Sequence, residues 1–118
     1  MVDPPFQWQV VRADLDPVRG SEQAGERPVL IVSHEAISRS LTIVTVLPIT
    51  TRRAGRRVYS TEALLPAGVA GLPHESIAMA HQVRTISKER LLRTCGWLDD
   101  EALRQRVRAA MRVHLDME

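Results

Sequence analysis

The chain has 118 residues, of which 44% are hydrophobic and 25% charged, and this composition predicts a single domain over residues 1–118. It has no apolar run of the about 18 residues that a membrane-spanning helix needs, and its N-terminus is not expected to be a signal peptide. Its single cysteine, Cys95, excludes an internal disulfide and favours the cytoplasm, and its net charge of +2 is weak evidence for a nucleic-acid partner.

The first half of the chain predicts three β-strands separated by polar segments. Residues 1–6 are expected to be flexible. The strands are predicted at residues 6–15, 29–32 and 41–50, and the second is apolar throughout, as in a strand covered on both faces. Between the second and third strands, Ser33 is expected to cap a short helical turn that ends at Ile37, with a loop at residues 38–40.

The second half of the chain predicts two more strands and two helices. The strands are expected at residues 58–65 and 76–86. Ser87 is expected to cap a short helix over residues 87–92, and acidic residues at 99–101 open the last helix, where the helix dipole favours them. The apolar stripe of that last helix consists of Leu103, Val107, Ala110 or Met111, and Leu115. Five strands followed by a helix predict a mostly β fold of the α+β class, a small antiparallel barrel with helical additions.

The polar stretch Gly20–Pro28 presents one arginine beside the buried strand. Its two glycines allow a tight turn, and Pro28 favours an extended conformation at Arg27, so we expect a loop that delivers Arg27 to the start of the strand. A guanidinium there could bind phosphate or carboxylate through two parallel hydrogen bonds. A surface ion pair with Glu22 or Glu26 is the simpler alternative, and composition alone favours it.

The residues that could carry chemistry are mainly arginines and hydroxyls. The four histidines and one cysteine lack the spacing of metal ligands, and no glycine-rich phosphate loop occurs, so no metal or cofactor is expected. All four histidines are expected to be structural, although His81 is of interest because its strand carries other polar residues. If the strand that follows Arg27 and the strand that ends at Thr50 are neighbours, a guanidinium and a hydroxyl would meet at one rim of the barrel and suit a reacting phosphate. The remaining candidates are Glu22, Gln23, Gln82, Arg84 and the loop arginines Arg52, Arg53, Arg56 and Arg57.

Each of these candidates also has a simpler interpretation. The Thr50 hydroxyl could bond to backbone at the end of its strand. The arginine loop could hold a nucleic-acid backbone, or it could be a solvated hairpin tip. Fifteen of the sixteen basic residues are arginine, which suits phosphate recognition but is explained equally well by codon bias. Spacing alone does not decide between these alternatives.

Five motifs, in matching order and spacing, resemble the MazF/PemK family of bacterial toxins, the endoribonuclease halves of type II toxin–antitoxin pairs. The resemblance covers the chain from about Val10 to Leu115. The motifs are Asp14-Leu15-Asp16-Pro17, Gly20-Ser21-Glu22-Gln23, Arg27-Pro28-Val29-Leu30-Ile31-Val32, Val46-Leu47-Pro48-Ile49-Thr50 and Gln82-Val83-Arg84-Thr85-Ile86.

The resemblance implies an SH3-like β-barrel with a C-terminal helix that works as a homodimer. It implies metal-independent, sequence-specific cleavage of single-stranded RNA to 2′,3′-cyclic phosphate and 5′-hydroxyl ends. The catalytic arginine and threonine of the family fall on Arg27 and Thr50, while Glu22 and Gln23 fall on a loop that orients the arginine or touches RNA. The implied partner is an antitoxin whose disordered C-terminal tail folds over the RNA groove. The residues expected to bind RNA or support the site are Arg52, Arg53, Arg56, Arg57, Gln82 and Arg84.

The start of the chain departs from the family pattern. The family opens with Arg-Gly-Asp or Arg-Gly-Glu, and these positions hold Gln7-Trp8-Gln9 here. Arg12 stands where an apolar residue is expected, and Glu26 stands where some members carry histidine. Two non-catalytic alternatives remain open: a barrel that poisons a protein target, as the related gyrase poisons do, and a degenerate homologue that only binds an antitoxin.

Overall fold

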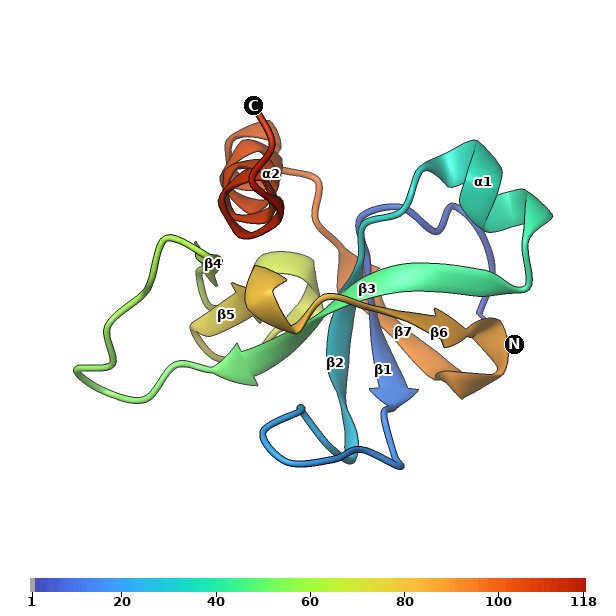
Figure 1. The fold of residues 1–118 in the computed structure, drawn as a ribbon, viewed down its shortest axis with the longest axis horizontal. Coiled ribbons are helices and arrows are strands. Elements are labelled where there is room, and N and C mark those ends of the chain that lie inside the picture. The colour runs from blue at the N-terminus through green and yellow to red at the C-terminus, as the bar shows by residue number, and fades with distance from the viewer. Residues whose placement is uncertain (1) are drawn as a thin grey trace.

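A computed structural model describes residues 2–118, which form seven β-strands, two α-helices and three short 3-10 helices (Figure 1). No helix within this range is both long enough and apolar enough to cross a membrane. The elements in chain order are β1 (Gln9–Asp14), β2 (Glu26–Ile31), α1 (Glu35–Ser40), β3 (Ile43–Thr51), β4 (Glu62–Leu65), η1 (Val69–Gly71), β5 (Ser76–Met79), η2 (Ala80–Gln82), β6 (Arg84–Ser87), η3 (Lys88–Arg90), β7 (Leu91–Trp97) and α2 (Glu101–Leu115).

All strand pairs are antiparallel, and β3 is the centre of the sheet. The strand order is β4-β5-β3-β2-β1-β7, with β6 also paired to β3. The first half of β3 pairs with β6 (Val44 opposite Ile86) and its end pairs with β5 (Thr50 opposite Ile77), as Figure 1 shows. The predicted mostly β fold with a C-terminal helix is therefore confirmed. The single strand predicted at residues 76–86 is wrong, because the chain needs the turn η2 to pass from one section of β3 to the other.

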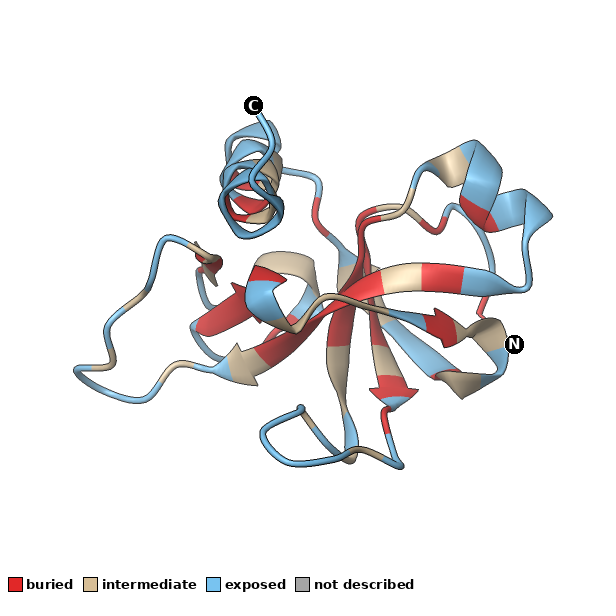
Figure 2. Cartoon of the chain, in the orientation of Figure 1, coloured by how far each residue is buried: buried red, intermediate tan, exposed pale blue. Residues whose placement is uncertain are grey.

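Side chains on the central strands alternate between two cores. One core contains Val10, Leu30 and Leu47, and α2 closes it with Leu103 and Val107. The second core lies on the opposite face of the same strands, and Figure 2 shows how much of β1, β2 and β3 is buried. Its members include Val11, Val29, Ile31, Val46, Phe6 and Leu15. The prediction of a strand at residues 29–32 that is covered on both faces is confirmed.

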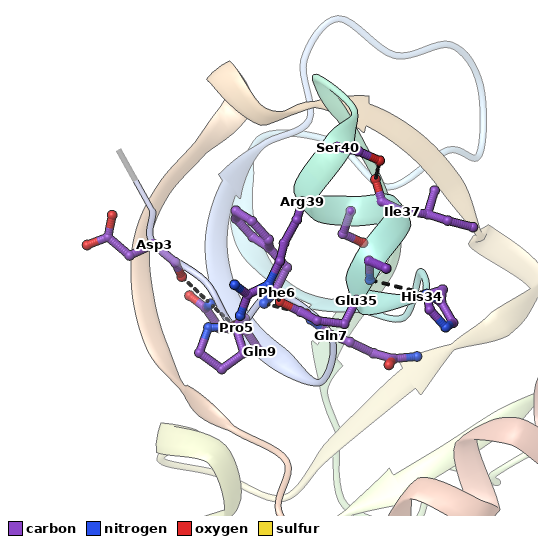
Figure 3. Close-up of polar contacts among 12 residues, drawn as sticks. Asp3, Pro5, Phe6, Gln7, Gln9, His34, Glu35, Ile37, Arg39 and Ser40 are labelled. Carbon is purple, nitrogen blue, oxygen red and sulfur yellow. Dashed lines mark hydrogen bonds and ion pairs between the residues drawn. The ribbon is translucent and has the colours of Figure 1, made fainter.

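The N-terminal segment is packed against the domain rather than flexible. Val2 and Phe6 are buried, so the expectation for residues 1–6 is wrong for residues 2–6, while Met1 lies outside the described residues. One carboxylate oxygen of Glu35 accepts hydrogen bonds from the backbone N–H groups of Phe6 (2.8 Å) and Gln7 (2.7 Å) (Figure 3). The other oxygen accepts from Arg39 at 2.6 Å. Helix α1 therefore anchors the start of the chain.

Gln9 provides the second anchor, at a position where the resemblance predicts an acid. Its side chain is fully buried, and its amide nitrogen donates to the carbonyl oxygens of Asp3 (3.1 Å) and Pro5 (2.8 Å) (Figure 3). Its carbonyl oxygen accepts from the Thr94 hydroxyl at 2.5 Å. An uncharged amide can donate to backbone carbonyls, which a carboxylate cannot. Gln9 thereby joins the terminal segment to β1 and β7.

Two predictions around the short helices are wrong in detail. Helix α1 begins after His34, whose Nδ1 accepts from the Ala36 N–H at 3.2 Å, and it continues to Ser40 through the residues predicted as loop. The Ser33 hydroxyl instead accepts from the Thr45 N–H at 3.1 Å. Ser87 does act as a cap, but only of the three-residue η3.

The strand β7 at Leu91–Trp97 was predicted in part as helix and otherwise missed. It is an edge strand that pairs with β1 through two register shifts. Leu92, Arg93 and Thr94 are all exposed, so the apolar alternation that indicates a strand is missing from its sequence. The strand predicted at residues 58–65 is also shorter, because β4 begins only at Glu62.

Helix α2 agrees with its prediction at the start and departs from it at the end. The Asp100 carboxylate caps the helix by accepting from the Leu103 N–H at 3.0 Å. The stripe residues Leu103, Val107 and Ala110 are buried, but Leu115 is 48% exposed. The last turn therefore extends beyond the core.

Candidate active site

Arg27 lies on β2 itself, opposite Ala13 of β1, and not in a loop ahead of the strand. The β1–β2 loop is closed by hydrogen bonds from the Leu15 N–H to the Gly25 carbonyl and from the Gly25 N–H to the Asp16 carboxylate, both 3.0 Å. Gly25 has a φ of +76°, a conformation that glycine adopts without strain. The Arg27 Nε donates to the Ala24 carbonyl at 3.2 Å, so the closed loop also orients the guanidinium.

A cavity opens where the pairing between β2 and β3 stops. The ladder ends at Val29 opposite Pro48, and Pro28 and Pro48 lack the N–H groups that could extend it. Two residues further in the same register, Arg27 would face Thr50. The strands separate there around a cavity of about 480 Å³. The side chains that line the cavity include Arg12, Arg27, Thr50, Arg53, His74 and Ser76.

This cavity is strongly cationic. Three arginines line it, and within residues 2–118 no carboxylate does. Burial lowers the pKa of Arg27 from its ordinary value, and the nearby charge of Arg12 lowers it further. A bound anion would relieve both effects, since it would replace lost water and offset the repulsion between the guanidinium groups.

Arg12 belongs to the cavity although an apolar residue was expected at its position. Its Nη2 donates to the Glu26 carbonyl at 3.1 Å, and its Nε lies 3.8 Å from a carboxylate oxygen of the same residue. Among residues 2–118, no group accepts a hydrogen bond from that buried Nε. The neighbours Val10, Val11 and Ala13 are fully buried, so the arginine does not disturb the packing of β1.

The arginine-rich loop after β3 contributes only one of its four arginines to the cavity. Arg53 lines it, whereas Arg52 pairs with Glu75 at 3.0 Å. Arg56 forms two hydrogen bonds to the Glu62 carboxylate, at 3.0 and 2.8 Å. The guanidinium of Arg57 lies 5.2 Å from the centre of the Tyr59 ring. Ion pairs and a cation–π contact therefore hold this loop in place, and it is not a free hairpin tip.

The family of the PemK-like, MazF-like toxins of type II toxin–antitoxin systems matches residues 6–115. The chain belongs to this family. Endoribonuclease MazF9 of Mycobacterium tuberculosis is 39% identical over 115 residues, covering 93% of this chain and 92% of the relative. Endoribonuclease EndoA of Bacillus subtilis is 35% identical over 103 residues, covering 87% of each chain. A solved mycobacterial endoribonuclease in complex with its cognate antitoxin has a TM-score of 0.79 and 25% identity, with 98% of both chains covered. The MazF-like barrel expected from the resemblance is confirmed.

In this MazF-like chain, four other predicted site residues lie in the β1–β2 loop or donate hydrogen bonds to it. The Gln82 amide donates to the Ser21 carbonyl at 3.3 Å, and Arg84 donates to the Leu15 carbonyl at 3.2 Å. Glu22 accepts from the backbone N–H of Arg19 at 3.2 Å. Gln23 lies half-buried in the same loop. These contacts favour a supporting role, since they hold the loop that orients Arg27.

The sequence did not indicate that Arg12 and His74 line this cavity. Arg12 is a polar residue in a largely buried strand, which was a usable hint, but His74 stands alone in a turn between η1 and β5. His81, the histidine of interest in the sequence, does not line the cavity. Its Nδ1 lies 3.4 Å from the Thr61 hydroxyl. The pairing of β5 with the end of β3 brings the His74 segment to this cavity.

Glu62 makes the stability of the arginine loop depend on pH. Burial alone would raise the pKa of its carboxyl, but hydrogen bonds from Arg56 and the Tyr59 N–H, with the charges of Arg56 and His81, outweigh burial and lower the pKa. A group with a lowered folded-state pKa stabilises the fold above its unfolded pKa, and this contribution is lost as pH falls through the folded value. We expect Glu62→Gln to lower the free energy of unfolding by about 1.5–3 kcal/mol at pH 7.

Urea unfolding at pH 7 and below about pH 4 would measure this effect, and the difference between Glu62→Gln and wild type is expected to shrink at the acidic pH. Glu89→Gln is the matched control, because Glu89 is exposed. A difference that does not change between the two pH values would contradict the role given to the charged form.

Proposed function

We propose that this chain is the toxin of a type II toxin–antitoxin pair and that it cleaves single-stranded RNA at specific sequences without a metal ion. The products are 2′,3′-cyclic phosphate and 5′-hydroxyl ends. The observation that carries the proposal is the cationic cavity that Arg27 and Thr50 share, because these two residues match the catalytic arginine and threonine of the family. The names of MazF9 and EndoA, which are endoribonucleases, support the same activity.

The cavity suits a reaction in which the ribose 2′-oxygen attacks the adjacent phosphorus. Negative charge builds up on the phosphoryl oxygens in the transition state, and a fixed cation and a hydroxyl donor stabilise it without reorganising. Arg27 supplies the cation and Thr50 the donor. The lowered pKa of Arg27 also makes a proton easier to remove from its guanidinium than from an exposed arginine. DNA lacks the 2′-hydroxyl and would bind without being cut.

The proposed partner is an antitoxin whose disordered C-terminal tail covers this cationic groove. A related endoribonuclease has been solved with its cognate antitoxin, which supports this partner. The proposed active form is a cytoplasmic homodimer of single-domain chains. Arg53 borders the groove and is assigned to the RNA backbone, whereas Arg52, Arg56 and Arg57 shape the loop that presents it.

The test is digestion of a long single-stranded RNA by the purified protein in EDTA, followed by mapping of both new ends. Discrete cuts with 5′-hydroxyl and cyclic phosphate ends would support the proposal and reveal the recognised sequence. Single-stranded DNA of the same sequence is the matched control and should remain intact. Intact RNA after incubation with a folded protein would overturn the proposal in favour of a protein-binding role.

Thr50→Val is expected to slow cleavage by about 10²-fold, because it removes one donor to the developing charge while keeping the shape of the side chain. Thr50→Ser keeps the hydroxyl and should retain most activity. The measurement is the single-turnover rate on an RNA that contains the recognised sequence. Thr85→Val is the matched control, since Thr85 lies on β6 and its hydroxyl bonds to Thr45 away from the cavity. Equal losses in Thr50→Val and Thr50→Ser would rule out a role for the hydroxyl.

A further inference from the structure

His74 lines the cavity and has no role in the chemistry proposed so far. It belongs to the short segment between η1 and β5, while the arginines of the cavity come from β1, β2 and the loop after β3. Of the residues in the described range that line the cavity, His74 alone has a side chain that readily exchanges a proton near neutral pH.

Backbone contacts fix the position of His74 relative to Thr50. Thr51, the neighbour of Thr50, pairs with Ser76 across the β3–β5 ladder. The Ser76 hydroxyl donates to the His74 carbonyl at 2.7 Å, and the Arg52 N–H donates to the Glu75 carbonyl at 2.8 Å. The turn that carries the imidazole is thus attached to the end of the strand that carries the hydroxyl.

The other charged side chains that line the cavity are arginines, so His74 is the side chain best suited to donate a proton. Arg12 on β1, Arg27 on β2 and Arg53 after β3 line the same cavity, and the adjacent Glu75 is paired with Arg52. The arginines stabilise negative charge well, but a guanidinium gives up a proton less readily than an imidazolium does. The 5′-oxygen that leaves during RNA cleavage carries a full negative charge unless it receives a proton, and a positioned acid typically accelerates such a step by about 10²–10⁴-fold.

We propose that protonated His74 is the general acid that protonates the 5′-oxygen leaving group, an inference that rests on the proposed function. The 2′-oxygen forms a bond to phosphorus and releases its proton to water. The bond between phosphorus and the 5′-oxygen breaks, its electron pair stays on the 5′-oxygen, and the imidazolium transfers its proton there. Water then returns a proton to the neutral imidazole, so charge and atoms balance and nothing is oxidised or reduced.

The decisive experiment compares two RNA substrates that differ in one atom at the cleaved bond. One has the ordinary 5′-oxygen, and the other has sulfur in that bridging position. A thiolate leaves without being protonated, so it does not need a general acid. His74→Gln is expected to cut ordinary RNA about 10²-fold or more slowly than wild type and to cut the sulfur substrate at nearly the wild-type rate. His81→Gln is the matched control and should behave as wild type on both.

The dependence of the single-turnover rate on pH gives an independent measurement. The rate of the wild-type protein on ordinary RNA should fall on the alkaline side of the pH profile, because a general acid must be protonated to act, and this fall should be missing in His74→Gln. Equal losses of His74→Gln on both substrates would show that His74 binds RNA and would overturn the proposal, as would unchanged rates. If wild type cuts neither substrate, the proposed function itself fails. Thermal unfolding of both variants shows whether they are folded, and exposed His74 is not expected to affect stability.

Discussion

Arg27→Ala is expected to slow RNA cleavage by at least about 10²–10³-fold while leaving the fold and antitoxin binding in place. Arg27 is one of the three arginines that line the cavity together with Thr50. Its Nε donates a hydrogen bond to the Ala24 carbonyl at 3.2 Å. Its loss removes the fixed charge opposite the developing phosphorane. It also relieves repulsion with Arg12, so the stability of the protein should not fall.

A further variant separates charge from geometry at this position. Arg27→Lys keeps the charge but loses the planar fork that can donate two parallel hydrogen bonds, so it should recover only a small part of the activity. Arg106→Ala is the matched control, because Arg106 is an exposed arginine on α2. The measurement is the single-turnover rate in EDTA, with circular dichroism to confirm folding. Cleavage by Arg27→Ala at the wild-type rate would contradict the assigned mechanism.

Trp8→Ala is expected to give the largest loss of stability, about 3–5 kcal/mol. The Trp8 side chain is only 5% exposed and packs in the core that α2 closes. The guanidinium groups of Arg104 and Arg108 on α2 lie 5.4 and 4.9 Å from its ring, which adds cation–π attraction to the buried area. The truncation therefore removes a large apolar side chain and the ring over which two arginines of α2 lie.

Hydrogen bonds and packing at Trp8 explain why this departure from the family pattern is tolerated. Trp8 has a φ of +72°, a conformation that suits the glycine of the family pattern and is unfavourable for a bulky residue. Its N–H donates to the Ile31 carbonyl and its own carbonyl accepts from the Leu98 N–H, both at 2.7 Å. These bonds and the packing of the ring outweigh the backbone strain.

Urea unfolding monitored by circular dichroism would measure the effect of Trp8→Ala. Trp97→Ala is the matched control, because Trp97 is 39% exposed and its truncation should cost much less. A loss below about 1 kcal/mol for Trp8→Ala would show that α2 does not depend on this ring.

Local sequence patterns predicted the elements that are defined by neighbouring residues in the chain. Residues 29–32 are apolar at every position because both faces of β2 are covered, and Asp100 lies where a carboxylate can cap the N–H groups of α2. The strand β7 was missed because its exposed positions do not alternate with apolar ones. The break in residues 76–86 at η2 has a different cause, because β3 pairs with β6 in its first half and with β5 at its end, and the chain must turn between them.

The motifs predicted the family, the mostly β fold with its terminal helix, and the two residues, Arg27 and Thr50, around which a site is expected. These motifs are local, so they can be recognised without knowledge of contacts between distant residues. Which other side chains line the same cavity follows only from the three-dimensional arrangement of the strands. The end of the β2–β3 ladder and the pairing of β5 with β3 bring Arg12 and His74 to the same cavity, whereas ion pairs with Glu75 and Glu62 hold Arg52 and Arg56 in the loop. These outcomes depend on strand register and on charge pairing across the fold, which spacing along the chain does not encode.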